Sequence, residues 1–238
     1  MRAIRLSFVQ MLAYMRRDVM LFAACLAPIL IGFVFRFVTP FLETVLTDWL
    51  NRPAIIAPYY ALIDILFTML SPAMFCFVSA MVSLEEADEK IAMYLFITPL
   101  GRTGYLFARL GIPAVAAFII TVILLPVFKL TALFPIDVLL FAAVGTLQGL
   151  IVALLILTFS SNKLEGMAIS KLSALTILGA VIPFFIKDNI QYISFSLPSF
   201  WIGKAVCENT LSYIFPALVL SVVWIWFLLK LYLRKIMK

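Results

Sequence analysis

The sequence predicts an all-α polytopic membrane protein with six transmembrane helices. Of its 238 residues, 65% are hydrophobic, and the mean hydropathy is +1.16. A soluble fold cannot bury that much apolar surface. Charged residues make up only 13% of the chain, and most lie between apolar runs of about twenty residues, the length that crosses a hydrocarbon core. We therefore expect a single transmembrane domain over residues 1–238.

An amphipathic segment precedes the first apolar run. Its apolar side chains recur at helical spacing and its arginines lie mostly on other faces; the apolar positions are Ile4, Phe8, Met11, Leu12 and Met15. A basic amphipathic helix of this kind lies flat at an anionic membrane surface. The sequence predicts an interfacial helix at 1–18 in contact with membrane lipids, and a frayed start of the first span is the alternative.

Six apolar runs have the length of a membrane span. We expect these spans at about 19–38, 59–82, 106–128, 136–159, 167–186 and 213–229. In the fourth run, Gly145 and Gly149 have the small-xxx-small spacing of closely packed membrane helices.

Two of the intervening segments are expected on the outer side. Thr39-Pro40 is a helix-start signal, and it predicts a short interfacial helix within 39–58. Residues 187–210 are aromatic and apolar but too short to span, which predicts a re-entrant or interfacial segment.

Arg36 and Asp64 are the ionisable residues near the outer ends of the first two spans. A charge inside a membrane is costly and normally faces a partner or a wet cavity. Since the two residues lie at similar expected depth, we predict an intramembrane ion pair. A role in the substrate path is the alternative.

A short amphipathic helix is expected at 85–99, between the second and third spans. It begins with four acids, Glu85, Glu86, Asp88 and Glu89. Ser83 and Glu86 have capping-box spacing, and a helix N-terminus favours negative charge. Pro99 disfavours helix at Thr98 and ends the segment. Acids bind anionic lipid poorly, so a docking surface for a protein is favoured over a helix resting on headgroups.

The next inner loop carries a second capping signal. Asn162 and Glu165 flank Lys163 with capping-box spacing before the fifth span. A plain helix cap explains Asn162 and Glu165 fully.

The charges predict the orientation. With both termini inside, 13 of the 18 Lys and Arg residues fall in the inner segments, as the positive-inside rule requires. The short acidic helix is then cytoplasmic.

The chemistry of a catalytic site is missing from the sequence. There is no histidine, the commonest metal ligand and general base, and the three cysteines match no metal spacing. No G-x-x-x-x-G-K-[ST], H-E-x-x-H or G-x-S-x-G motif occurs. We expect no enzyme activity and no bound metal. The net charge of +6 reflects the positive-inside bias rather than a nucleic-acid partner.

The 85–109 stretch resembles the inner loop after the second span of type-2 ABC exporter permeases. The shared features are the acidic cluster, a short helix, Thr98-Pro99, a Leu and a basic residue at Arg102, with Ala108-Arg109 in the place of Gly-Lys. The chain departs from the pattern with Lys90-Ile91 for Gly-Thr and Met93 for Glu. The loop 160–166 and the Leu197–Trp201 segment also resemble that family.

The resemblance implies a half-transporter permease without its own nucleotide-binding domain. Residues 85–99 would be the coupling helix, and the ATPase-coupling residues would be Glu85, Glu86, Asp88, Glu89, Lys90, Tyr94, Thr98, Pro99 and Arg102. Asn162, Lys163 and Glu165 would form a second contact. The partners would be separate ABC ATPase subunits, which bind ATP and magnesium, and a second permease chain in a homodimer or heterodimer.

The implied function is ATP-driven export of a hydrophobic or amphipathic substrate, such as a drug, lipid or peptide, across a prokaryotic cytoplasmic membrane. Two alternatives remain open at this stage. An ion-coupled secondary transporter would use Asp64 or Arg36, and a membrane-embedded protein without transport activity would use neither.

Overall fold

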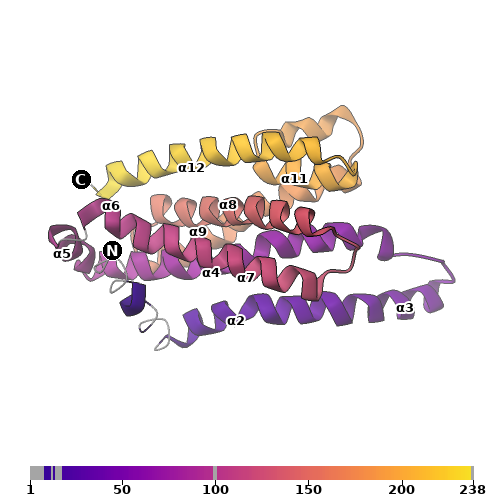
Figure 1. The fold of residues 1–238 in the computed structure, drawn as a ribbon, viewed down its shortest axis with the longest axis horizontal. Coiled ribbons are helices and arrows are strands. Elements are labelled where there is room, and N and C mark those ends of the chain that lie inside the picture. Colours follow the sequence, from indigo (N-terminus) through magenta and orange to yellow (C-terminus); the bar gives the residue numbers. More distant parts are fainter. Residues whose placement is uncertain (1–7, 12, 14–17, 99–100, 237–238) are drawn as a thin grey trace.

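The computed structural model describes residues 8–11, 13, 18–98 and 101–236, and this part of the chain is helical with no β-strand. The helices are α2 (Val19–Phe33), α3 (Thr39–Leu50), α4 (Tyr60–Asp88), α5 (Ile91–Ile97), α6 (Gly101–Leu106), α7 (Ile112–Phe128), α8 (Pro135–Phe159), α9 (Lys163–Ala174), α10 (Ile182–Phe185), α11 (Pro198–Cys207) and α12 (Ile214–Ile236). They form an elongated bundle (Figure 1).

Five stretches of the described residues are long and apolar enough to cross a membrane, one fewer than the six predicted. They are Val19–Leu50, Ala57–Asp88, Gly101–Phe128, Pro135–Phe159 and Leu211–Ile236. The predicted fifth span, 167–186, is a broken helix in which α9 gives way to a 3₁₀ turn at Leu175–Ala180 before α10. Pro183 lies near the start of α10, where its missing N–H interrupts a continuous helical ladder.

The broken segment nevertheless returns the chain along the bundle. α9 starts at the end of the bundle that carries α5, and α11 lies near the opposite end, where α3 finishes (Figure 1). We call these the α5 end and the α3 end. The start of α2 and the finish of α12 both lie at the α5 end, as the prediction of two termini on one side requires.

The first span is longer than predicted. The helix predicted within 39–58 is present as α3, which begins at Thr39, but a π-helical turn at Val34–Val38 joins it to α2 without a break. In this turn the Thr39 N–H bonds to the Val34 carbonyl, five residues back, and the shifted ladder accommodates the missing N–H of Pro40.

The predicted interfacial helix at 1–18 lies mostly outside the described residues. Residues 8–11 are helical, and Met11 is buried against α4, with its sulfur 3.9 Å from the Ser79 hydroxyl. Asp18 caps α2 by accepting from the N–H groups of Met20 at 2.9 Å and Leu21 at 3.2 Å, the usual role of an acid at this position.

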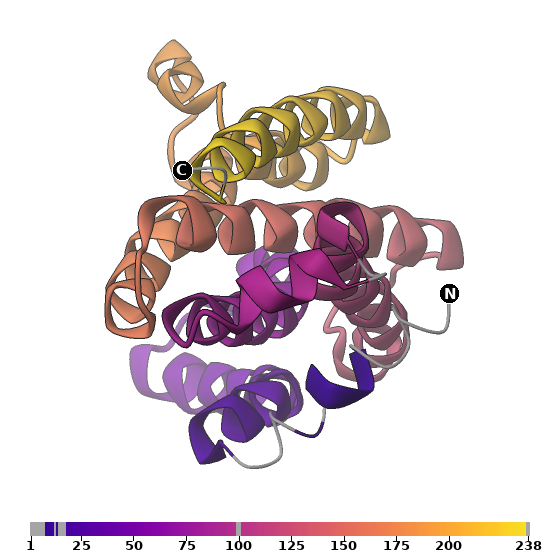
Figure 2. The same cartoon turned by 90° about the vertical axis from the view of Figure 1, so that its left-hand side faces the viewer.

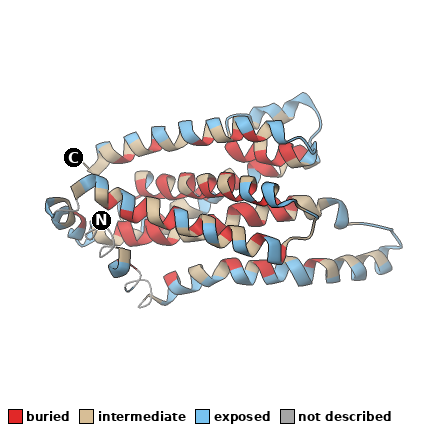
Figure 3. Ribbon diagram, viewed as in Figure 1, coloured by how far each residue is buried: buried red, intermediate tan, exposed pale blue. Residues whose placement is uncertain are grey.

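α4 and α8 form the centre of the bundle (Figure 3). In their most apolar stretches 72% and 67% of residues are buried, against 17% in Val19–Leu50. A Cβ on Gly145 would lie 2.2 Å from the Thr68 carbonyl oxygen, and one on Gly149 would lie 3.0 Å from the Pro72 and Ala73 backbone. The predicted small-xxx-small contact is therefore confirmed, since both glycines let the two backbones approach closely.

The outer segment at 187–210 folds back onto the bundle. α11 packs against α12 and the 3₁₀ turn at Leu175–Ala180, and Phe200 and Ile202 are buried. The Trp201 indole donates to the Phe195 carbonyl at 2.7 Å. Phe200 is thus part of the internal packing, whereas Tyr192 and Phe195 of the same segment are exposed.

Candidate functional site

The α5 end brings together the acidic tail of α4, the short helix α5 and the loop before α9 (Figures 1 and 2). The predicted helix start near Ser83 is wrong, because α4 runs on to Asp88 and the Ser83 hydroxyl donates to the Ser79 carbonyl at 2.9 Å. The four acids therefore lie at or just past the C-terminal end of a helix, where the dipole disfavours negative charge. Cationic side chains from other elements must therefore offset the unfavourable interaction of these acids with the helix dipole.

α5 begins six residues later than the predicted coupling helix. Lys90, with φ of 60°, reverses the chain after α4. The Thr98 hydroxyl closes the other end by donating to the Leu95 carbonyl at 2.6 Å. Pro99, predicted to end the helix, lies outside the described residues. Gly101, with φ of 63°, turns the chain into α6, a conformation that favours glycine.

α5 has one packed face and one exposed apolar face. Ala92 is buried, and the Phe96 ring meets the Tyr105 ring edge to face at 5.2 Å. On the other face Met93, Tyr94 and Ile97 are 65%, 72% and 85% exposed. We call these three residues the α5 patch. Apolar side chains this exposed, next to charged neighbours, are typical of a protein contact.

Glu86 and Arg109 form an ion pair beneath α5. The Arg109 Nε donates to Glu86 Oε2 at 2.8 Å, and Nη2 bonds to Oε1. The Tyr105 hydroxyl donates to the same carboxylate at 3.0 Å. The Arg109 side chain is 2% exposed and that of Glu86 15%. The pair therefore ties α4 to the third span with the bidentate geometry that makes such bonds strong.

A π-helical turn at Phe107–Gly111 places Arg109 in this pair. The Ser79 hydroxyl of α4 donates to the Arg109 carbonyl, so both the backbone and the side chain of Arg109 are held by α4. π-turns leave backbone groups out of the regular ladder and are frequent at functional sites.

Lys163 joins three elements at the α5 end. Its ammonium binds Asp18 Oδ2 at 2.6 Å and Glu85 Oε2 at 2.8 Å, while its backbone N–H donates to Asp88 at 3.2 Å. The hydrogen bond from Lys163 is the main cause that lowers the pKa of Asp18. Burial acts to lower the pKa of Lys163, but its bonds to Asp18 and Glu85 outweigh burial and raise it. We call this cluster the Lys163 junction.

The predicted second inner loop is thus brought to the predicted coupling segment. The Asn162 side chain accepts from the Glu165 N–H at 2.8 Å, which confirms the predicted N-cap. The Glu165 carboxylate accepts from the Ser161 N–H at 2.7 Å, so the reciprocal bond goes to the residue before the cap.

The predicted coupling residues divide into two groups. Glu85, Glu86 and Asp88 are engaged within the chain, whereas Glu89, Lys90, Tyr94, Thr98 and Arg102 are exposed. The contacts of Asp18, Tyr105 and Arg109 were not anticipated. A charge such as Arg109 at the edge of an apolar run is a signal for a buried partner, but the sequence does not identify that partner as Glu86.

Arg36 and Asp64 do not pair with each other, and the predicted ion pair is absent from the salt bridges of the described residues. Asp64 accepts from the N–H groups of Leu130 and Thr131, each at 2.8 Å, and from the Thr131 hydroxyl at 2.5 Å. Arg36 donates to the Lys129 carbonyl at 2.7 Å. Both side chains secure the loop between α7 and α8, whose free backbone groups offer closer partners.

The comparisons with known proteins identify the family. The model of the family described as "Fluoroquinolones export permease protein Rv2686c-like" matches residues 11–229. The chain belongs to this family. Its members are ABC-2 type permeases, so the chain is a multi-pass membrane protein of an export permease family. The comparisons with curated proteins and with solved structures found no match.

The family match covers the whole α5 end except the last residues of α12. The α5 patch, the Glu86–Arg109 pair and the Lys163 junction all fall inside it. These features therefore belong to the export permease region of the chain.

Proposed function

We propose that this chain is the membrane subunit of an ATP-driven drug exporter and that a separate ATPase subunit docks on the α5 patch. The observation that carries the proposal is the combination of an exposed apolar patch with a rigid base. Met93, Tyr94 and Ile97 face outward, and the packed face of the same helix rests on Tyr105.

The base connects α5 to most of the bundle. The Tyr105 hydroxyl donates to Glu86, and the Glu86–Arg109 pair binds α4 to the third span. The Lys163 junction binds α4 to α9 and to the start of α2. A displacement of α5 by the ATPase would therefore move these helices together rather than bend a loop, as a switch between two packed arrangements requires.

ATP and magnesium belong on the partner in this proposal. The chain has no G-x-x-x-x-G-K-[ST] motif, the loop that holds nucleotide phosphates. A second permease chain, identical or related, would complete the transport path. Nucleotide binding would close two ATPase subunits and move the two α5 helices with them.

The proposed cargo is a hydrophobic or amphipathic drug. The family description names fluoroquinolones, and we propose this drug class as the first to test. The ion-coupled alternative depended on Asp64. Its carboxylate is engaged by three hydrogen bonds to the loop after α7, an arrangement that suits a structural role better than cycles of proton uptake.

Co-purification with each ATPase encoded beside the chain tests the proposal. We expect stoichiometric capture of an ATPase, weakened by Ile97→Asp, because the variant places a charge in the α5 patch. Phe134→Asp is the matched control, since Phe134 is also apolar and exposed but precedes α8. Glu86 is avoided because its substitution would also break the pair with Arg109.

A fluoroquinolone efflux assay in cells adds the functional result. We expect efflux with the chain and its ATPase, and loss of efflux with Ile97→Asp but not with Phe134→Asp. A folded chain that captures no ATPase, or that loses capture equally with both variants, would contradict the proposal.

A further inference from the structure

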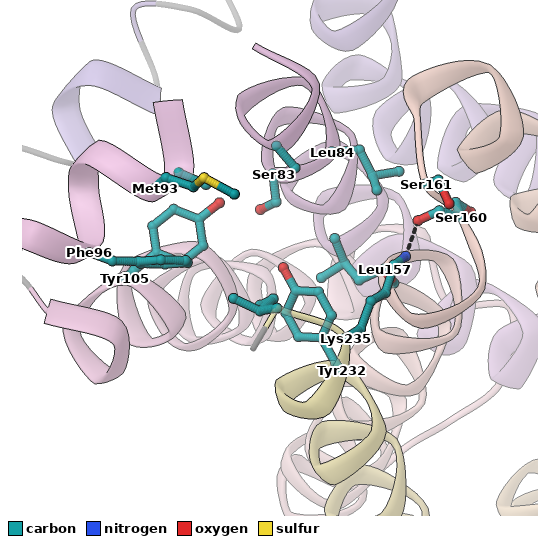
Figure 4. Close-up of a pocket in the computed structure, with 13 residues that line it drawn as sticks. Ser83, Leu84, Met93, Phe96, Tyr105, Leu157, Ser160, Ser161, Tyr232 and Lys235 are labelled. Atoms are coloured by element: carbon teal, nitrogen blue, oxygen red, sulfur yellow. Dashed lines mark hydrogen bonds between the residues drawn. The ribbon is translucent and has the colours of Figure 1, made fainter. Parts of the chain in front are cut away.

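A cavity of about 180 Å³ lies between the packed side of α5 and the end of α12. Its walls come from α4, α5, α12 and the loop after α8 (Figure 4). Leu84, Met93, Phe96 and Leu157 supply apolar surface. An apolar cavity of about 150 Å³ accepts a benzene ring, so this one has room for a single ring and a small substituent.

Polar groups without a protein partner lie on one side of this cavity. The Ser160 hydroxyl has no hydrogen-bond partner among the residues that the structure describes, but it is fully buried and opens no surface into the cavity. The Tyr232 hydroxyl makes no hydrogen bond to any described residue either, and it points toward the space between Ser83 and Leu157 (Figure 4). A buried hydroxyl left unpaired costs about 1–3 kcal/mol, so a ligand that engages it gains affinity.

A cation lies beside these hydroxyls. The Lys235 ammonium donates to the carbonyls of Leu157, at 2.9 Å, and Ser160. An ammonium has three N–H donors, so one remains for a ligand. The opposite wall adds no free negative charge, because the carboxylate that Tyr105 contacts, Glu86, is neutralised by Arg109.

We propose that this cavity binds a small amphipathic anion, namely a carboxylate carried on one aromatic ring or a short acyl chain. The carboxylate oxygens accept from the Lys235 ammonium and from the Tyr232 hydroxyl. The ring lies against Leu84, Met93 and Phe96. A carboxylate is favoured over a neutral hydroxyl because a hydrogen bond between two charged groups is roughly twice as strong as a neutral one.

The site has a consequence for α5. Met93 and Phe96 come from α5, whereas Lys235 comes from α12, so a bound anion bridges the two helices. Occupancy lowers hydrogen exchange in α5. Met93 of the α5 patch also lines the cavity, but this proposal does not rest on the docking of an ATPase, because its test uses the chain alone.

Fluorine NMR of the purified full-length chain in nanodiscs, with 4-fluorobenzoate as the probe, tests the site. We expect a saturable bound signal, with affinity at least about tenfold weaker for the neutral isostere 4-fluorobenzyl alcohol. Lys235→Gln weakens binding about tenfold or more, and Tyr232→Phe weakens it several-fold. Tyr59→Phe leaves binding unchanged, because Tyr59 is not in the cavity wall and stacks on Phe185.

A filled cavity provides the decisive variant. Ala92→Leu places a larger side chain in the cavity wall and abolishes the bound signal, while Tyr232→Phe keeps the carbonyl contacts of Lys235 and so separates binding from folding. Hydrogen exchange of α5 falls with 4-fluorobenzoate in the native chain only. No saturable signal at millimolar probe, or a signal that persists in Ala92→Leu, would overturn the proposal.

Discussion

Removal of the Glu86 carboxylate is the sharpest test of the contacts among Tyr105, Glu86 and Arg109 that support α5. Glu86→Ala leaves the Arg109 guanidinium, 2% exposed, without its carboxylate and removes the acceptor of the Tyr105 hydroxyl. Breaking a buried ion pair from one side costs about 3–5 kcal/mol. Because Glu86 retains 15% exposure, we expect the lower end of this range, about 3 kcal/mol.

The free energy of unfolding in mixed detergent micelles, titrated with a denaturing detergent, measures this loss. Glu89→Ala is the control, since Glu89 is exposed and its removal should change stability by less than about 0.5 kcal/mol. Replacing both partners, with Glu86→Leu and Arg109→Met, should recover much of the loss because no buried charge remains. Equal stability of Glu86→Ala and Glu89→Ala would refute the structural role of the pair.

Three further predictions concern other contacts, each measured by the same unfolding titration. Lys163→Met should cost about 1–2 kcal/mol. The pKa of Asp18 is lowered and that of Lys163 raised, so the cost should be full between about pH 4 and pH 10. It should shrink below that range as Asp18 is protonated, and above it as Lys163 is deprotonated. Gly145→Ala should cost about 1–3 kcal/mol because its Cβ meets the α4 backbone, whereas Gly149→Ala should cost less, because its Cβ would lie 3.0 Å rather than 2.2 Å from the α4 backbone. Asp64→Asn should cost about 1–3 kcal/mol while the surviving protein still exports.

Each of these predictions has an outcome that contradicts it. A pH-independent cost of Lys163→Met would show that the Lys163 junction does not act through charge. Equal effects of Gly145→Ala and Gly149→Ala would remove the argument for unequal helix approach. Asp48→Asn is the control for Asp64→Asn, since Asp48 is exposed, and lost export at unaltered stability would place Asp64 in the substrate path instead.

The apolar runs predicted the class of fold because membrane spans are set by hydrophobicity and length. They did not predict helix ends. α4 runs past Ser83 because no residue there breaks a helix, and the Ser83 hydroxyl finds a carbonyl within its own helix. The π-turn at Val34–Val38 likewise lets a helix continue through Pro40. Both effects depend on which backbone N–H and carbonyl groups bond to each other. The same sequence signals can begin a helix, so the sequence alone does not decide these helix ends.

The sequence also did not predict which residues far apart in the chain contact each other. The sequence placed four acids on one loop and Lys163 on another, but the contact of Lys163 with Glu85 and Asp18 depends on how the bundle closes. The Arg36–Asp64 pair failed for the same reason. Depth along two spans gives no information on which side each residue faces, and the loop after α7 offered both residues closer partners.

The most direct test of the central claim is a photo-cross-link from α5. A photoreactive phenylalanine analogue replaces either Tyr94, in the α5 patch, or Trp49, exposed in α3, and the complex is irradiated in membranes that export drug. The account predicts a cross-link between position 94 and the ATPase and none from position 49. A cross-link from position 49, or none from position 94 in an exporting complex, would contradict it.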